Sequence, residues 1–317
     1  VSSMAERAAS LPCWADLGTP TIQSTGEVAA ELQLGEGRTN QNFVATLEGG
    51  RRLFVRIGSD LPAYGVTRVR EQAASRAAAS VGIGPSVVHS EADALVCEFL
   101  PGRTLTSAQL SAACTTDGDP LLPLVAATVR KLHACPPPPE LSAAGASGWA
   151  PADVLRWLAL AESKGYERLP VVSEGRELIA AVEAVAGPAS AATFCHFDLL
   201  PDNFVRDGDA VWLIDYEYAA AGQPMLDLAI LSMGCELPPE GDARLLAAYY
   251  EQPEVDGATL RRFSALKLLA WLRETMWGVT AEVSGTSALS MEEATAYTDK
   301  NYSGFIAARD AFFAAGA

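Results

Sequence analysis

One stretch near the middle of the chain restricts the possible folds more than any other. It reads His196-Phe-Asp198-Leu-Leu-Pro-Asp-Asn203, and an apolar run from Val211 to Ile214 then leads directly to Asp215. The run is typical of a buried strand, and Asp215 at its end is expected to face the preceding loop. A single Asp beside a proline is usually explained as a turn cap. The complete pattern is much harder to obtain by chance, and it gathers two carboxylates and an amide at one place.

This set of residue types suits phosphoryl transfer. One carboxylate has to orient the attacking hydroxyl and receive its proton, while an amide and a second carboxylate hold Mg²⁺ against the phosphates. Asp198 and Asn203 on one tight loop bring a base and a metal ligand together, and Asp215 approaches from the adjacent strand. The pattern therefore predicts Asp198 as the catalytic base, and Asn203 and Asp215 as metal ligands.

The character of the chain changes near residue 102. Before that point short alternating segments surround a turn at Gly49-Gly50, and after Pro101-Gly102 helical patterns prevail, apart from a β-rich island at 193–218. These patterns predict an α+β chain with a small β-rich lobe at 1–102 and a larger, mostly helical lobe at 103–317. Strands are expected at 43–47, 52–57, 86–89 and 94–99, and helices at 67–79, 121–134, 152–163, 174–185, 242–250, 260–283 and 291–313.

The first lobe carries weaker signals for the same chemistry. A polar, glycine-containing loop at 35–42 precedes a strand, and such a loop can fold over phosphates and donate backbone N–H groups. Arg56 ends the next strand, where a kinase places its phosphate-binding cation, and Glu71 in the following helix is positioned to pair with it. Glycine-rich turns are common and a strand arginine is usually solvated, so these signals depend on the motif of the second lobe.

Bulk properties exclude several classes of protein. The net charge of −16 argues against a nucleic-acid partner, and it favours a cationic substrate only weakly because it also serves solubility. No apolar run approaches the roughly 20 residues of a membrane helix. The first ten residues lack the apolar core of a signal peptide, and the six scattered cysteines read as buried, reduced thiols. The prediction is a cytoplasmic protein that does not insert into membranes.

At these motifs the sequence resembles the choline/ethanolamine kinase family, within the broader aminoglycoside-phosphotransferase-like kinases. The likeness extends from about Leu34 to Phe313. The resemblance implies a protein-kinase-like two-lobed fold that uses ATP and Mg²⁺. Leu200 stands where protein Ser/Thr kinases carry Lys, and Asp215-Tyr-Glu217 replaces their D-F-G, so a protein kinase is disfavoured. The similar segments are Gly37-Arg-Thr-Asn40-Gln-Asn42-Phe, Leu53-Phe-Val-Arg56-Ile-Gly58, Cys195 to Phe204, Leu213 to Ala219 and Pro224 to Ala229.

The resemblance also implies roles for individual residues. Arg56 and Glu71 would hold the ATP phosphates under a loop bearing Thr39, Asn40 and Asn42. The hinge from Glu98 to Leu100 would take adenine through backbone groups, and Glu217 would assist with metal or substrate. His196, His133 and Asp227 are expected to be structural, with Asp227 bracing the catalytic loop from a helix start.

The acceptor is expected among the last helices. A small cationic alcohol needs aromatic faces and carboxylates, and this region offers Trp271, Glu274, Trp277 and Tyr297. Trp277 and Tyr297 match the family's choline-binding aromatics, but Glu274 replaces a tryptophan, so the cage is altered. Choline, ethanolamine, another amino alcohol, thiamine and an aminoglycoside stay open as acceptors. So do a homodimer and a non-catalytic binding protein of the same fold.

Overall fold

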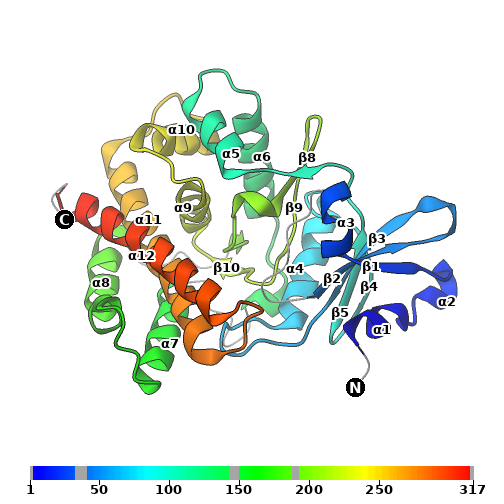
Figure 1. Ribbon diagram of the computed structural model, residues 1–317. Helices are drawn as coiled ribbons and strands as arrows, with labels where there is room; N and C mark the ends of the chain where they lie inside the picture. Colours follow the sequence, from blue (N-terminus) through cyan, green and yellow to red (C-terminus); the bar gives the residue numbers. More distant parts are fainter. Residues whose placement is uncertain (1–2, 33–40, 143–149, 188–192, 315–317) are drawn as a thin grey trace.

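The structure is a computed structural model that describes residues 3–32, 41–142, 150–187 and 193–314 (Figure 1). An antiparallel five-stranded sheet forms the first part, in the order β1-β2-β3-β5-β4. The expected hairpin is present, and both Gly49 and Gly50 adopt a φ of 84°, which glycine accepts without strain. The strands are β1 (Thr21–Ser24), β2 (Gln41–Thr46), β3 (Arg52–Ile57), β4 (Val87–Glu91) and β5 (Ala94–Glu98).

Helix α4 (Arg68–Ser80) lies between the sheet and the helical part of the molecule (Figure 1). The sheet packs against α1 (Met4–Ala9) and α2 (Trp14–Leu17) in a small apolar cluster of its own. Ala74 and Ala78 of α4 instead belong to the large cluster of the helical part. Helix α4 is therefore anchored in the second core while its start faces the sheet. Helix α3 (Thr25–Leu32) follows β1.

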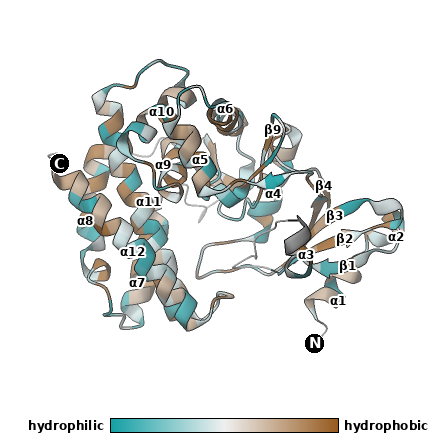
Figure 2. Cartoon of the chain, turned by 45° about the horizontal axis from the view of Figure 1, so that its top comes forward, coloured by the Kyte–Doolittle hydropathy of each residue, from teal (hydrophilic) through white to brown (hydrophobic). Residues whose placement is uncertain are grey.

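Helix α11 (Gly257–Ser284) forms the centre of the larger lobe and is buried almost continuously from Phe263 to Ala281. A Cβ on Gly278 would lie 2.5 Å from Thr298 Oγ1, so the two longest helices meet closely there. Figure 2 shows both polar and apolar residues along the outer helix α12 (Met291–Ala314), as expected for a helix with one buried face. The other helices are α5 (Ser107–Thr115), α6 (Leu121–Ala134), α7 (Ala150–Ser163), α8 (Val171–Ala186), α9 (Pro224–Gly234) and α10 (Pro239–Tyr250).

The expected β-rich island consists of two small sheets inside the helical lobe. In the first, β7 (Thr193–Cys195) pairs with β10 (Ala220–Gly222). In the second, β8 (Phe204–Asp207) lies between β6 (Arg103–Thr104) and β9 (Ala210–Leu213). These strands fix both ends of the loop that contains Asp198.

The predicted fold class is therefore confirmed: a β-rich first lobe precedes a mostly helical second lobe. The boundary at 102/103 stays a prediction; β6 begins at Arg103 and already pairs with the second lobe. No helix in the described ranges is both long enough and apolar enough to cross a membrane.

Candidate active site

The loop after β7 holds Asp198 and Asn203 in direct contact. The Asn203 side-chain amide donates hydrogen bonds to the Asp198 backbone carbonyl at 2.8 Å and to its Oδ2 at 3.0 Å. A short 3-10 turn (Pro201–Asn203) closes the loop, and Phe197 takes a left-handed φ of 56°. The motif thus folds so that a carboxylate and an amide share one position.

Asp227, in the first turn of α9, holds the backbone of this loop in place. Its two carboxylate oxygens accept hydrogen bonds from the backbone N–H groups of His196 and Phe197, each at 2.7 Å. His196 Nε2 donates to the Ile214 carbonyl at 2.9 Å, which ties the loop to the end of β9. These contacts confirm the structural roles expected for Asp227 and His196.

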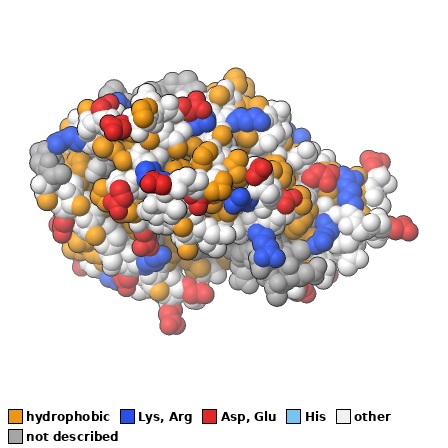
Figure 3. All heavy atoms as spheres, turned by 90° about the horizontal axis from the view of Figure 1, so that it is seen from above, with side chains coloured by type: hydrophobic (Ala, Val, Ile, Leu, Met, Phe, Trp, Pro, Cys, Tyr) orange, Lys and Arg blue, Asp and Glu red, His pale blue; other side chains and the backbone are white. Residues whose placement is uncertain are grey.

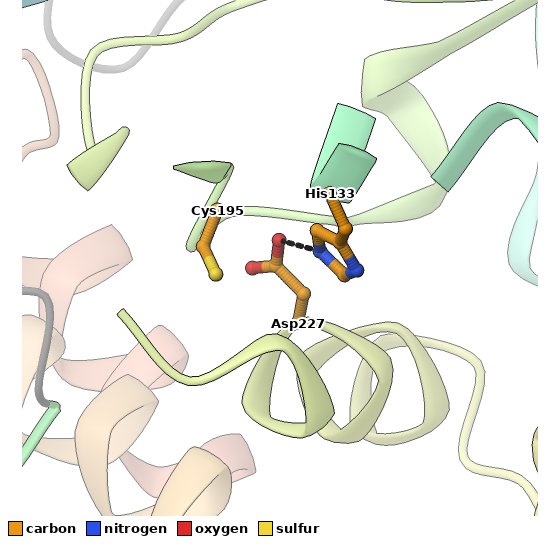
Figure 4. Close-up of side chains that lie close together, drawn as sticks. All are labelled: His133, Cys195 and Asp227. Carbon is orange, nitrogen blue, oxygen red and sulfur yellow. Dashed lines mark hydrogen bonds and ion pairs between the residues drawn. The ribbon is translucent and has the colours of Figure 1, made fainter. Parts of the chain in front are cut away.

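Figure 4 shows His133, Cys195 and Asp227 close enough together to suggest a metal site. Their bonding argues against one. His133 uses Nε2 to reach Asp227 Oδ2 at 3.0 Å and Nδ1 to reach the Tyr249 hydroxyl at 2.7 Å. Burial raises the pKa of the Cys195 thiol well above its ordinary value, so the thiol is protonated in the metal-free protein. We therefore assign this cluster to bracing the loop.

Asp215 follows β9 and also adopts a left-handed backbone, with a φ of 63°. A non-glycine residue held in this conformation is strained, and such strain is common at functional sites. Enclosure by the surrounding protein and the nearby Glu217 carboxylate raise the pKa of Asp215 to about 7, against the opposing charges of Arg56 and Arg68. Burial, together with Glu274, likewise raises the pKa of Asp198 well above its usual range.

A chain of four buried charges runs from the first lobe to the second. Arg56 of β3 pairs with Glu71 Oε1, and Arg68 Nη1 approaches Glu71 Oε2 at 2.7 Å and Glu217 Oε2 at 3.2 Å. None of the four residues is more than 5% exposed. Burial, aided by the positive charge of Arg68, lowers the pKa of Arg56 to about 10, so Arg56 remains charged at neutral pH. The expected pairing of Arg56 with Glu71 is confirmed; the link through Arg68 was not anticipated.

A cavity of about 210 Å³ opens between the two lobes, beside these buried charged residues. Its apolar walls include Phe54, Phe99 and Val205. The cavity joins seven of the residues singled out from the sequence: Asn42, Arg56, Glu71, Glu98, Leu100, Asn203 and Asp215. Thr39 and Asn40 lie outside the described residues.

The segment from Glu98 to Leu100 can bind a ligand through its backbone. The Glu98 side chain turns to the surface and pairs with Arg51. Leu100 makes no backbone hydrogen bond with any described residue, and it lines the cavity. Its N–H and carbonyl are thus available to a bound molecule.

A second group of residues lies near Asp198, whose pKa Glu274 helps to raise, and lines no part of the cavity. Glu274 accepts a hydrogen bond from the Tyr297 hydroxyl, and the indole N–H of Trp277 donates to the Tyr218 hydroxyl at 2.7 Å. The Trp277 ring lies 5.1 Å from that of Tyr297 and 5.3 Å from that of Tyr64. We call Tyr64, Tyr218, Glu274, Trp277 and Tyr297 the aromatic cluster.

A family model described as the phosphotransferase enzyme family matches residues 31–265. The chain belongs to this family. A choline/ethanolamine kinase family protein from Mesorhizobium loti is 25% identical, with a TM-score of 0.70 over 96% of this chain and 93% of that one. The GDP and kanamycin complex of APH(2″)-IIIa is 18% identical, with a TM-score of 0.62 over 95% and 99%. A segment of 58 residues is 34% identical to Protein LicA of Haemophilus influenzae; it covers 18% of this chain and only 22% of that protein.

Two arginines of this phosphotransferase site were missed from the sequence. Arg68 has been described above. Arg273 is 2% exposed, and its guanidinium lies 5.0 Å from the centre of the Tyr218 ring and 5.6 Å from that of Trp157. Its Nη1 is 3.8 Å from Glu274 Oε2. The signal for Arg273 was a charged pair, Arg273-Glu274, inside an otherwise apolar stretch of helix.

Trp271, which was expected at the acceptor site, lies apart from the aromatic cluster. Its ring packs against Gly304 of α12, where an added Cβ would come within 2.4 Å of it. Glu274 and Trp277 lie three and six residues further along α11, in contact with Tyr297 instead. The structure thus brings Glu274, Trp277 and Tyr297 together and places Trp271 between helices.

The charged surface of the phosphotransferase is mixed where Figure 3 shows it. Basic and acidic side chains alternate over this face, and they do not gather into one basic tract on its described part. A phosphate backbone would therefore meet both signs of charge there.

Proposed function

We propose that this phosphotransferase transfers the γ-phosphoryl group of ATP to the hydroxyl of choline or a related small amino alcohol. The observation that carries the proposal is the position of Asp198. It contacts Asn203, which lines the cavity, and it lies within the electrostatic influence of Glu274 in the aromatic cluster. A base at that position can serve a nucleotide on one side and an acceptor on the other.

The cavity is proposed as the nucleotide site. Its apolar walls suit the stacking of a purine ring, and the backbone of Leu100, which makes no backbone hydrogen bond with a described residue, suits the ring's hydrogen bonds. Arg56 at the inner end would hold phosphate oxygens while Glu71 fixes its direction. The amide of Asn42 supports this assignment, since its Oδ1 is buried without a partner among the described residues and the side chain lines the cavity.

The donor set at the inner end fits Mg²⁺. Asp215 offers carboxylate oxygens, and Asn203 has its Nδ2 committed to Asp198, so Oδ1 is the atom it has left to offer. Oxygen donors of this kind are those that Mg²⁺ prefers. When bound there, the ion would supply positive charge against the phosphate oxygens.

The residues then define one reaction. Asp198 accepts a hydrogen bond from the acceptor hydroxyl and takes its proton as the hydroxyl oxygen bonds to the γ-phosphorus. The bond from that phosphorus to the bridging oxygen of the β-phosphate breaks, and ADP leaves with both electrons of that bond. The raised pKa means that the Asp198 carboxylate, once ionised, is a stronger base than an ordinary aspartate.

The aromatic cluster is proposed to hold the amine of the acceptor. A cation is stabilised by ring faces and by a carboxylate, and here Glu274 lies among Trp277, Tyr297 and Tyr218. Glu274 already contacts Tyr297 and lies near Arg273, so its negative charge is partly offset. An amine that can donate hydrogen bonds is therefore a candidate acceptor in addition to choline.

A coupled assay of ADP release tests the proposal. Purified protein with Mg²⁺ and ATP is offered choline, ethanolamine, other amino alcohols, thiamine and kanamycin, each at matched concentration. We expect acceptor-dependent turnover with choline or an amino alcohol. Turnover confined to kanamycin or thiamine would overturn the acceptor class. Binding of MgADP without any turnover would instead indicate a binding protein.

A further inference from the structure

Arg68 lies at the junction of the two halves of the proposed site. It is the first residue of α4, and it lines no part of the cavity. Its Nη1 contacts carboxylates from both lobes, Glu71 in its own helix and Glu217, which is 149 residues further along the chain. The Arg68 side chain thus connects Glu71, which pairs with Arg56, to Glu217, which directly precedes Tyr218 of the aromatic cluster.

Burial of the Arg68 side chain carries a desolvation cost. The side chain is only 2% exposed, and burying a guanidinium requires compensation by hydrogen bonds and opposite charges. A cation in the first turn of a helix also opposes the helix dipole. Among the described residues, the guanidinium is compensated by the Ser59 carbonyl, to which Nε donates at 2.9 Å, and by the charges of Glu71 and Glu217; the backbone N–H donates separately to Asp60 Oδ1 at 2.8 Å. The side chain is therefore held in one orientation.

We propose that Arg68 is a positioning residue that couples the acceptor half of the site to the nucleotide half. It fixes Glu217 relative to Glu71, and Glu71 in turn fixes Arg56. Glu217, beside Tyr218 of the aromatic cluster, and the phosphate-binding Arg56 are thereby held at one separation, which in-line transfer requires. This inference rests on the proposed function for what the two halves bind.

The geometry explains why arginine is needed. One planar fork donates to Ser59 through Nε and to both carboxylates through Nη1. Lysine carries a single ammonium group without the Nε donor, so it cannot reproduce the complete set. Lysine at this position is expected to keep the charge and to lose part of the alignment.

The test compares Arg68→Gln, Arg68→Lys, Glu217→Gln and the double variant Arg68→Gln/Glu217→Gln. Arg76→Gln serves as the matched control, because Arg76 is an exposed arginine of the same helix that contacts Ser90. Three quantities are measured for each: kcat/KM for the acceptor found in the panel, the Kd of MgADP by calorimetry, and the melting temperature.

We expect Arg68→Gln to lower kcat/KM for the acceptor by about 30-fold or more while the Kd of MgADP changes less than about 3-fold. The double variant should be no worse than the poorer single variant, since both remove the same link. Arg68→Lys should recover part of the loss, and Arg76→Gln should match the wild type. A purely structural role would instead move the melting temperature without this split between acceptor and nucleotide.

Other outcomes overturn the inference. Effects of Arg68→Gln and Glu217→Gln that simply multiply would mean that the two residues act independently. An equal loss of MgADP affinity would place Arg68 in the nucleotide half alone. If Arg68→Gln does not fold, the comparison of Arg68→Lys with Glu217→Gln decides in the same way. If wild type turns over no acceptor, the proposed function fails, and the link is still judged by whether Arg68→Gln and Glu217→Gln combine non-additively in the melting temperature of the double variant.

Discussion

The two halves of the site are built on different principles. The nucleotide half is an open cavity whose polar residues include side chains of β2, β3, α4 and the segments around β8 and β9. The acceptor half is a packed cluster in which Glu274 and Trp277 already have partners within the protein. An open site built from local motifs can bind the same cosubstrate throughout a family. A packed cluster has to be adjusted for each acceptor, so specificity is expected to depend on the aromatic cluster.

The largest effect should come from the residue that serves both halves. Asp198→Ala removes the base, and we expect kcat to fall by about 10³-fold or more. The Kd of MgADP should change little, because Asp198 does not line the cavity. Rapid-quench or coupled ADP assays measure the first quantity and calorimetry the second. Turnover close to that of the wild type would remove Asp198 as the base and with it the proposed division of the site.

Asp215→Ala should affect only the nucleotide half. Loss of its carboxylate leaves Asn203 as the single proposed metal ligand, so the affinity for MgADP should fall by about 10²-fold. The affinity for ADP measured in EDTA should stay nearly constant, which separates metal binding from purine binding. Equal affinities in Mg²⁺ and EDTA for the wild type would contradict the assignment of Asp215.

The motif around Asp198 could be predicted from sequence because its parts are local. Asp198 and Asn203 lie five residues apart, and one turn brings them into contact. Arg68 and Arg273 could not be found in this way. Each has partners in other elements, Glu217 for Arg68 and the Tyr218 ring for Arg273, and a list of charges does not say which of them become buried together. Strand β1 (Thr21–Ser24) was missed as well, because its short, partly exposed sequence lacks a clear alternation.

The position of Trp271 also depends on a contact between distant elements, which the sequence does not show. Its spacing from Trp277 suggested a shared site, but the close approach of α12 at Gly304 draws its ring into the helix interface. Helical spacing alone does not reveal which face a neighbouring helix covers. The cavity, in contrast, joins residues that the family motifs had already brought together, such as Arg56 and Asp215.

The nucleotide half should also respond to pH. The raised pKa of Asp215, about 7, means that its carboxyl is half protonated near neutrality when no metal is bound. Metal binding requires the ionised form, so protons compete with Mg²⁺ below that pH. We expect the affinity for MgADP to fall by about 5-fold from pH 7 to pH 6 and to level off above pH 8. Calorimetry in two buffers of different ionisation enthalpy should detect proton release at pH 6.5; its absence would place the pKa of Asp215 well below 7.

The smallest expected effect isolates the acceptor half. Trp277→Ala removes the ring that contacts Tyr64 and Tyr297 and the indole N–H that donates to Tyr218. If the ring only binds the acceptor cation, the acceptor KM should rise by about 3- to 30-fold, as cation–π energies suggest, with kcat much less affected. Trp277→Phe keeps a ring face without the N–H, so its acceptor KM should lie between those of the wild type and Trp277→Ala. Trp271→Phe is the control for packing of α11. The KM for ATP distinguishes the two interpretations. A constant value places Trp277 in the acceptor half, whereas a parallel rise would mean that the ring supports the whole site, and the contrast between an open and a packed half would no longer describe its function.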